Sequence, residues 1–185
     1  MKIISVWSRK GGTGKTTISY MLAGAAVDRG LKVLLIDDDN QASGVWLSEF
    51  NNVPFEVVKG WPEHQPNVDL VIVDMPPRTD DKPLGTVIIP YQATPLDFGA
   101  TARYIPELRK TNKVIEVINR RRNIAIQNEF IKGISLDKRM IINERSIYQT
   151  VTANGRNIFD PELKNKYGIR EAKQEITNLL NEALA

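Results

Sequence analysis

The chain has 185 residues, of which 42% are hydrophobic and 25% charged, and this size favours one globular domain over residues 1–185 with a full core of its own. It contains no cysteine and one histidine, which excludes disulfides, thiolate nucleophiles and iron–sulfur ligation and argues against a Ser-His-Asp triad or a multi-histidine metal site. The net charge of +3 divides into −1 over residues 1–110 (12 Lys/Arg against 13 Asp/Glu) and +4 over residues 111–185 (13 against 9), so a polyanionic partner is expected to meet the C-terminal portion.

The predicted elements alternate between strands and helices. Residues 2–7 and 32–39 are continuous Val-, Ile- and Leu-rich runs typical of buried parallel strands, and residues 16–29 between them have apolar side chains at helical spacing. Further strands are predicted at 69–74, 86–91, 113–118 and 139–143, and further helices at 98–111, 124–132, 146–153 and 169–183. Residues 51–67, NNVPFEVVKGWPEHQPN, are predicted to be a loop insertion. The pattern predicts an α/β fold with a doubly wound, mainly parallel sheet flanked by helices.

A glycine-rich segment, SRKGGTGKTT at residues 8–17, separates the first predicted strand from the first predicted helix. This context predicts the phosphate-binding loop of a P-loop NTPase, because glycines let backbone N–H groups converge on phosphates at a helix N-terminus. Lys15 is placed to neutralise phosphate charge, and the Thr16 hydroxyl is placed to ligate Mg²⁺. Arg9 stands where the strict pattern has a glycine, and Lys10 has no role within its own nucleotide site.

Carboxylates end two of the predicted strands. Asp37, Asp38 and Asp39 end one strand, and Asp74 ends another. In a strand, Asp37 and Asp39 point to one side and Asp38 points away, so Asp38 is expected to be solvent exposed. Carboxylates in this arrangement suit a Mg²⁺ held mostly through waters, with a further carboxylate left to position an attacking water.

In their order along the chain, these motifs resemble those of the deviant Walker-motif ATPases of the ParA/MinD class, and most of all the short plasmid-partition ATPases. The segments that carry the resemblance are RKGGTGKTT, LLIDDDNQAS, VIVDMPP, VIIPYQATPLDF and INERSIYQTVTANGRNIFD. Asn40 departs from the class, which usually has proline at this position. The N-terminal DNA-reading domain of larger members has no counterpart here, so repression at an operator is not expected.

The resemblance implies a role for each residue of the nucleotide site. Catalysis is assigned to Lys10, Lys15 and Asp39: Lys10 reaches across a sandwich dimer to the partner's phosphates, Lys15 binds phosphate in its own subunit, and Asp39 orients the attacking water. Thr16 is expected to ligate Mg²⁺, with Asp37 and Asp74 acting through its waters. The nucleotide-binding residues are Lys10, Gly11, Gly12, Thr13, Gly14, Lys15, Thr16, Thr17 and, at the adenine, Asn119.

The implied function is that of a DNA-partition ATPase in the prokaryotic cytoplasm, associated with the nucleoid. ATP is expected to close a homodimer that binds duplex DNA without sequence preference, and a centromere-bound adaptor is expected to stimulate slow hydrolysis. Arg145 matches an arginine that meets DNA in partition ATPases. Five further basic residues are candidate DNA contacts: Lys138, Arg139 and the run Arg120, Arg121 and Arg122, which is equally well interpreted as an ordinary exposed turn.

Two other functions stay open at this point. The first is a membrane-surface or cargo-positioning switch of the same class. Its membrane version is not favoured, because the final segment REAKQEITNLLNEALA has two basic and three acidic residues, a balance of −1. The second is a small-molecule ligase or synthetase, whose known members do not need Lys10.

Overall fold

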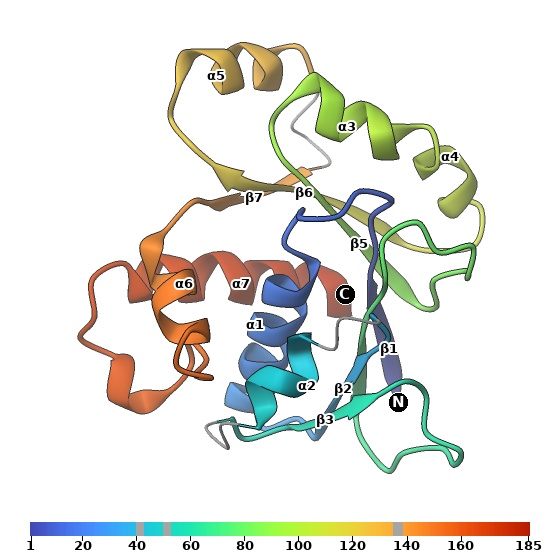
Figure 1. The fold of residues 1–185 in the computed structure, drawn as a ribbon, viewed down its shortest axis with the longest axis vertical. Coiled ribbons are helices and arrows are strands. Elements are labelled where there is room, and N and C mark those ends of the chain that lie inside the picture. Colours follow the sequence, from blue (N-terminus) through green and yellow to red (C-terminus); the bar gives the residue numbers. More distant parts are fainter. Residues whose placement is uncertain (40–42, 50–52, 135–138) are drawn as a thin grey trace.

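The computed structural model describes residues 1–39, 43–49, 53–134 and 139–185, and it shows one seven-stranded sheet (Figure 1). The strands are β1 (Lys2–Val6), β2 (Val33–Asp37), β3 (Glu56–Lys59), β4 (Leu70–Asp74), β5 (Thr86–Tyr91), β6 (Val114–Arg121) and β7 (Arg139–Asn143). Their order in the sheet is β3-β2-β4-β1-β5-β6-β7, and each neighbouring pair is parallel. The helices are α1 (Lys15–Asp28), α2 (Ser43–Ser48), α3 (Pro95–Ala102), α4 (Ile105–Leu108), α5 (Ala125–Lys132), α6 (Ser146–Thr152) and α7 (Ile169–Leu184), with a 3₁₀ turn at Pro161–Leu163.

The strand that precedes the glycine-rich loop lies at the centre of the sheet. β1 pairs with β4 on one side and β5 on the other, and Val6 is opposite Asp74 in one pairing and Ile88 in the other. The chain runs outward from β1 to β2 and β3, returns to β4 beside β1, and continues on the other side through β5, β6 and β7. In such doubly wound sheets, ligands bind at the carboxyl ends of the strands where the strand order reverses. The loop after β1 emerges at this place.

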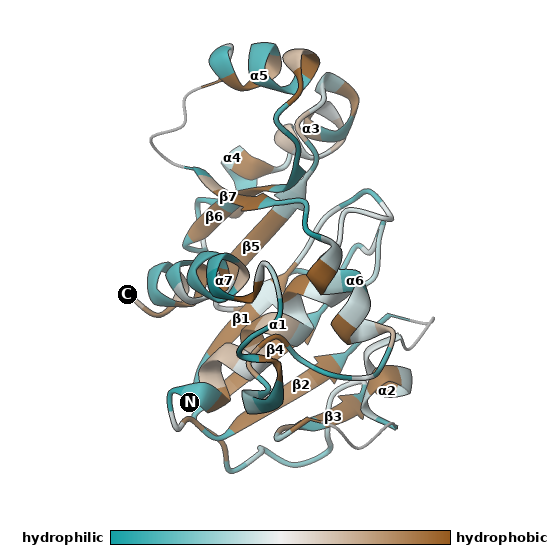
Figure 2. Cartoon of the chain, turned by 90° about the vertical axis from the view of Figure 1, so that its left-hand side faces the viewer, coloured by the Kyte–Doolittle hydropathy of each residue, from teal (hydrophilic) through white to brown (hydrophobic). Residues whose placement is uncertain are grey.

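Helices cover both faces of the sheet (Figures 1 and 2). One core packs alternate strand residues such as Leu35 against α1, α6 and α7, and it includes Leu47 of α2. The other core packs the intervening residues, such as Leu34, against Ile105 of α4 and Ile131 of α5. Because both faces are buried, the strands are apolar along their whole length, which explains the continuous apolar runs of the sequence.

Helix α1, which follows the glycine-rich loop, is held on several sides. Residues 18–26 are all buried. The Tyr20 hydroxyl donates to the Gly155 carbonyl (3.1 Å), and the Asn157 side-chain amide donates to the Tyr20 carbonyl (2.6 Å). A Cβ at residue 24 would lie 2.2 Å from Asn157 Oδ1, so this close approach requires Gly24. The position of the helix N-terminus is therefore fixed by the core and by the turn after α6.

The observed elements confirm the predicted fold class and correct three predictions. Residues 51–67 contain the edge strand β3, whose Glu56 and Lys59 are exposed, so the strand has no apolar run. Helix α2 was not predicted. The predicted helix 98–111 begins earlier and is two short helices, α3 and α4, because Pro106 lacks the N–H that a continuous helix would bond to Ala102. No helix within the described ranges is both long and apolar enough to cross a membrane.

Candidate nucleotide-binding site

The glycine-rich loop turns sharply between β1 and α1. Gly12 and Gly14 have φ values of +75° and +92°, a left-handed conformation that glycine adopts without strain. A Cβ at residue 14 would lie 2.3 Å from Asn119 Nδ2, which donates to the Thr13 carbonyl (2.7 Å). Asn119, near the end of β6, therefore supports the loop from a strand that is separated from β1 by β5. The first N–H groups of α1, which have no partner within a helix, lie behind this turn and form an anion site.

Lys15, the first residue of α1, is a buried cation facing carboxylates. Its exposure is 6%, and burial lowers its pKa, while the charges of Asp74 and Asp39 raise it. A desolvated ammonium in this position gains strongly from a phosphate ligand, because attraction between charges is larger in a poorly solvated site. The predicted phosphate-binding role of Lys15 agrees with this placement.

Asp74, at the end of β4, is the most strongly perturbed acid of the site. Burial raises its pKa to about 7; the charge of Asp37 adds to the rise, and the neighbouring Thr16 hydroxyl and Lys15 ammonium oppose it. Its Oδ1 accepts from the Ser19 hydroxyl (3.4 Å), whereas its buried Oδ2 has no hydrogen-bond partner among the described residues. A cation bound near Thr16 would supply the missing partner, so these residues fit Mg²⁺.

Asp37 and Asp39 lie on the adjacent strand end, and they differ in environment. Asp37 is the register partner of Asp74 and is buried; its carboxylate accepts the backbone N–H groups of Gly44 (2.7 Å), Val45 (3.1 Å) and Asp39 (3.2 Å). The Asp37 carboxylate thus fixes the start of α2 and the backbone of Asp39. A role for Asp37 at the waters of Mg²⁺ stays a prediction. Asp39 is half-buried and close enough for its charge to raise the pKa of Lys15.

Asp38 was predicted to be solvent exposed, but its side chain is half-buried in the structure. It lines a separate pocket together with Asp81 and Trp61. Burial raises its pKa, and the charge of Asp81 adds to the rise. The segment after β4 therefore folds back over the end of β2, which the sequence pattern of a single strand does not reveal.

Residues 7–10, which precede the glycines, are attached to α3 and α4. Lys10 forms an ion pair with Asp97 of α3, which is buried and shares the N-cap of that helix with Thr94. The hydroxyls of Ser8 and Thr101 lie 3.4 Å apart. Two further contacts are with the ring of Tyr104: an edge-to-face contact from Trp7 (5.8 Å) and the guanidinium of Arg9 (5.1 Å), which also donates to the Thr79 carbonyl (2.9 Å). Four successive residues thus contact one segment, 94–104, and Lys10 is held there by a carboxylate.

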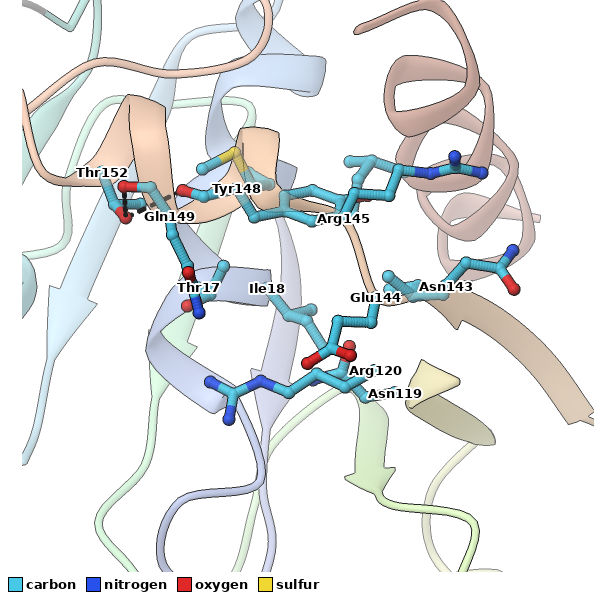
Figure 3. A pocket seen from close by; sticks show the side chains of 13 residues that line it. Thr17, Ile18, Asn119, Arg120, Asn143, Glu144, Arg145, Tyr148, Gln149 and Thr152 are labelled. Atoms are coloured by element: carbon cyan, nitrogen blue, oxygen red, sulfur yellow. Dashed lines mark hydrogen bonds between the residues drawn. The ribbon is translucent and has the colours of Figure 1, made fainter. Parts of the chain in front are cut away.

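A pocket beside the loop extends the site away from the phosphate position (Figure 3). It lies between α1, the ends of β6 and β7, and the first turns of α6. Its lining includes the predicted residues Thr17 and Asn119. It also includes Arg120 and Arg145, which were predicted as DNA contacts, and residues that were not predicted, among them Glu144, Tyr148 and Gln149. Glu144 directly follows β7, and Tyr148 and Gln149 lie in α6, so their place after a strand end at this sheet edge is the signal that points to them. The predicted contact between Asn119 and adenine would lie in this pocket, and it stays a prediction.

The predicted DNA-contacting residues do not gather into one exposed basic surface. Arg145 Nη2 donates to Glu175 (2.7 Å). Arg139 bonds to the buried Glu116 (3.0 Å) and to the Tyr91 hydroxyl (2.8 Å). Of the arginine run, Arg120 and Arg122 are exposed, Arg122 pairs with Glu144, and Arg121 donates to Asn128 (3.0 Å). Lys138 lies outside the described residues.

An all-parallel sheet with a glycine loop after its central strand, a buried lysine, and a threonine and a carboxylate at the adjoining strand end defines a P-loop NTPase. The sequence profile of the CobQ/CobB/MinD/ParA nucleotide binding domain matches residues 4–172, and the chain belongs to this family. This result confirms the predicted ParA/MinD class and its nucleotide-binding ATPase domain. The predicted ligands ATP and Mg²⁺ agree with this family.

Three individual proteins are similar to this chain over most of its length. The maintenance of carboxysome distribution protein A of Halothiobacillus neapolitanus is 27% identical over 217 residues, covering 98% of this chain and 95% of the relative. A putative plasmid partition protein from Borrelia burgdorferi B31, solved bound to AMPPNP, shares the fold with a TM-score of 0.71, 22% identity and 98% coverage of both chains. MinD from Pyrococcus horikoshii OT3, solved with Mg-ADP, does so with a TM-score of 0.71, 17% identity, and coverage of 97% of this chain and 96% of that chain.

Proposed function

We propose that the chain is an ATP-driven partition ATPase that closes as a homodimer on ATP, binds duplex DNA of any sequence and releases it after slow hydrolysis. The observation that carries the proposal is the position of Lys10. This cation belongs to the phosphate loop, yet its charge is held by Asp97 of α3 and its side chain is 44% exposed. A cation beside the loop that is not used by its own nucleotide site suits the phosphates of a second copy.

Closure of the dimer would exchange one anionic partner of Lys10 for another. In a single subunit the partner is a carboxylate, and in the closed pair it would be a phosphate of the facing subunit. Because the ammonium keeps an anion in both states, the exchange avoids leaving an unpaired charge at the interface. The charge that Lys10 brings would be most useful where negative charge increases on the transferring phosphoryl group.

Within one subunit, the described residues divide the work of nucleotide binding and water activation. When bound, Mg²⁺ supplies charge neutralisation of the phosphates. Lys15 would bind phosphate from the α1 side, and Thr16 and Asp74 would hold the cation. Asp39, fixed through its backbone by Asp37, would orient the attacking water. Catalysis of this kind consists mostly of positioning and electrostatics, so hydrolysis by the protein alone is expected to be slow.

For DNA, the described residues support a different basic surface from the one predicted. Arg145 and Arg139 already have carboxylate partners. The turn that leads into α7 exposes Lys164, Lys166 and Arg170, and it also exposes Tyr167 almost completely. We therefore assign the phosphate contacts to these three cations, with the exposed Arg120 as a further contact. Two copies of such a turn in a dimer would double the charge that meets one duplex.

The proposed cargo is a plasmid or chromosome, connected to the ATPase through a centromere-bound adaptor on the bacterial nucleoid. A second candidate is the positioning of a protein assembly through an adaptor bound to that assembly. It has equal support, because the relative that matches 98% of this chain is a maintenance of carboxysome distribution protein. The membrane-surface alternative gains no support from α7, whose apolar residues Ile176, Leu179 and Leu180 are buried in the core beside α1.

Sizing of the protein with ATP, with ADP and without nucleotide, each with and without DNA, tests the proposal. A dimer is expected with ATP but not with ADP or without nucleotide. The ATP-bound protein should bind two unrelated duplexes with equal affinity. This affinity should fall steeply as the salt concentration rises, since phosphate contacts release counterions. Substitution of Lys164, Lys166 and Arg170 by alanine should weaken DNA binding without affecting the dimer. The matched control substitutes the exposed Lys32, Lys59 and Lys82. Salt-insensitive binding, or tight binding to one duplex only, would reject non-specific DNA as the partner.

Asp39→Ala separates water activation from nucleotide binding. The variant should bind ATP normally and hydrolyse it roughly 100-fold more slowly, the size of a lost general-base or water-positioning contribution. Phosphate release under single-turnover conditions measures the effect. Unchanged turnover would transfer the role to another carboxylate, most plainly Asp37, which lies at the same strand end.

A further inference from the structure

One carboxylate of α7 reaches the strand end that borders the nucleoside pocket. Glu175 is 14% exposed at its side chain, and its Oε1 accepts from Asn143 Nδ2 (2.6 Å) and from Arg145 Nη2 (2.7 Å). Its Oε2 accepts the backbone N–H of Asn143 (3.2 Å). Three donors of the connection between β7 and α6 thus converge on one side chain from a helix much later in the chain.

These contacts determine where Glu144, the residue between the two donors, points. The backbone at Arg145 is extended (φ −139°, ψ 133°), and in extended backbone successive side chains point to opposite sides. Asn143 and Arg145 point toward α7, whereas Glu144 points the other way, toward Arg120 across the pocket (Figure 3). Arg122 donates to both oxygens of this carboxylate, from Nη2 to Oε1 (2.7 Å) and from Nε to Oε2, so a nucleoside donor would share the carboxylate with this guanidinium.

The same segment of α7 also supports the wall of the pocket opposite Arg120. The Tyr148 hydroxyl donates to the Ala172 carbonyl (3.5 Å), one turn before Glu175. Burial raises the pKa of Tyr148, and the nearby charge of Glu175 adds to the rise, so the phenol stays protonated as a donor. Ile176, the next residue of α7, lines the pocket itself. Asn143 and Arg145, with which Glu175 forms its hydrogen bonds and ion pair, both lie outside the phosphate loop.

We propose that Glu175 is a positioning residue for the nucleoside half of the nucleotide site. By holding Asn143 and Arg145 against α7, it aims the Glu144 carboxylate at hydrogen-bond donors of the nucleoside, which are the ribose hydroxyls or the exocyclic amine of adenine. It also fixes the wall formed by Tyr148. Glu175 therefore strengthens binding of the nucleoside and not binding of the phosphates, which contact the loop and Lys15. The inference rests on nucleotide binding alone and not on the proposed dimer or DNA contacts.

Titration calorimetry with Mg-ATP and with Mg-tripolyphosphate tests this division. Glu175→Gln should weaken ATP binding roughly tenfold, the size of one charge-assisted hydrogen bond, and leave tripolyphosphate binding within about twofold. The matched control is Glu171→Gln, which changes an exposed carboxylate one turn earlier on the same helix and should affect neither ligand. Equal weakening of both ligands, or unchanged ATP binding, would overturn the proposal.

Two further ligands identify which nucleoside group Glu144 meets. ITP lacks the exocyclic amine, and 2′-deoxyATP lacks one ribose hydroxyl. The unmodified protein should bind one of them more weakly than ATP, and Glu175→Gln should reduce that difference; discrimination that is unchanged in the variant would overturn the proposal.

A second variant keeps the test decisive if Glu175→Gln does not fold. Asn143→Ala removes one of the groups that Glu175 holds, and it should weaken ATP binding in the same direction and spare tripolyphosphate. ATP affinity that is unchanged in Asn143→Ala would overturn the proposal. Failure of the unmodified protein to bind ATP would instead contradict the nucleotide site on which the proposed function also depends.

Discussion

Lys15 and Lys10 lie on opposite sides of the same glycines, and their environments are different. Lys15 is buried at the start of α1, its pKa is lowered by burial, and carboxylates at the ends of β2 and β4 face it. Lys10 is half-exposed, and its partner is a carboxylate on α3, on the other side of the sheet. The loop therefore has an inner half, residues 13–16, directed at its own ligand, and an outer half, residues 7–10, attached to a surface segment.

The difference shows how two identical side chains acquire different roles. Burial makes Lys15 dependent on an anion, because few water molecules can stabilise its charge. Exposure leaves Lys10 partly solvated in the separate subunit, so it can give up its partner there at low cost. Substitutions on the inner half should thus affect ligand binding, and substitutions on the outer half should affect association between copies.

The largest expected effect is on the inner half. Lys15→Ala should weaken Mg-ATP binding at least about 100-fold, since several charge-assisted contacts to phosphate are lost at a poorly solvated position. Titration calorimetry measures the loss, and far-ultraviolet circular dichroism controls for folding. Binding within about threefold of the unmodified protein would show that the glycine cradle suffices without the lysine.

On the outer half, Lys10→Ala should leave Mg-ATP affinity within about threefold and abolish the dimer that ATP induces, because the trans contact to phosphate is removed. Light scattering after size-exclusion chromatography measures the dimer. Lys82→Ala, at another exposed lysine, serves as the control. A normal ATP dimer in Lys10→Ala would place this lysine outside the interface and remove the contrast between the two halves.

A pH effect should belong to the inner half alone. In the ligand-free protein, the pKa of Asp74 is raised to about 7 from an ordinary 3.8, so between these values the folded state binds more protons than the unfolded state. The contribution of Asp74 to the free energy of unfolding therefore falls as pH rises through this window. Urea unfolding from about pH 5 to about pH 8 should show this fall in the unmodified protein and in the control Asp80→Asn but not in Asp74→Asn. Parallel curves for all three would mean that Asp74 is already ionised in the folded protein.

The smallest effect is expected at the partner of Lys10. Asp97→Asn keeps the shape of the α3 cap but loosens the hold on Lys10 in the separate subunit, so the ATP dimer should form at a concentration about twofold to threefold lower, as for a partly exposed ion pair. Sedimentation velocity over a concentration series measures the shift. A weaker dimer would show that Asp97 also holds Lys10 in the closed pair.

The sequence allowed the inner half of the site to be predicted because its residues are close together or end neighbouring strands. Lys15 and Thr16 follow the glycines directly, and Asp37 and Asp74 end apolar runs that become adjacent strands. Strand periodicity and the parallel βαβ pattern suffice for such positions.

The outer half and the basic residues depend on partners that are distant in the sequence. Lys10 meets Asp97, Arg145 meets Glu175, and Arg139 meets Glu116, and no local pattern predicts these pairs. Two of the predicted DNA contacts, Arg145 and Arg139, therefore concerned charges whose availability depends on tertiary structure. The edge strand β3 was missed for a related reason, since its stability comes from pairing with β2 and not from its own hydrophobicity.

The central position of β1 has a consequence for synthesis of the chain. Although it is made first, β1 finds its two neighbours only when residues 70–74 and 86–91 have left the ribosome, because these form β4 and β5. Until then, β1 and the glycine-rich loop that follows it have no neighbouring strands to pair with. Parallel pairing between strands so far apart in the sequence is slow. We therefore expect the nascent N-terminal half to stay without its native pairing until β4 and β5 are made, and nucleotide binding to require that about half of the chain or more has folded.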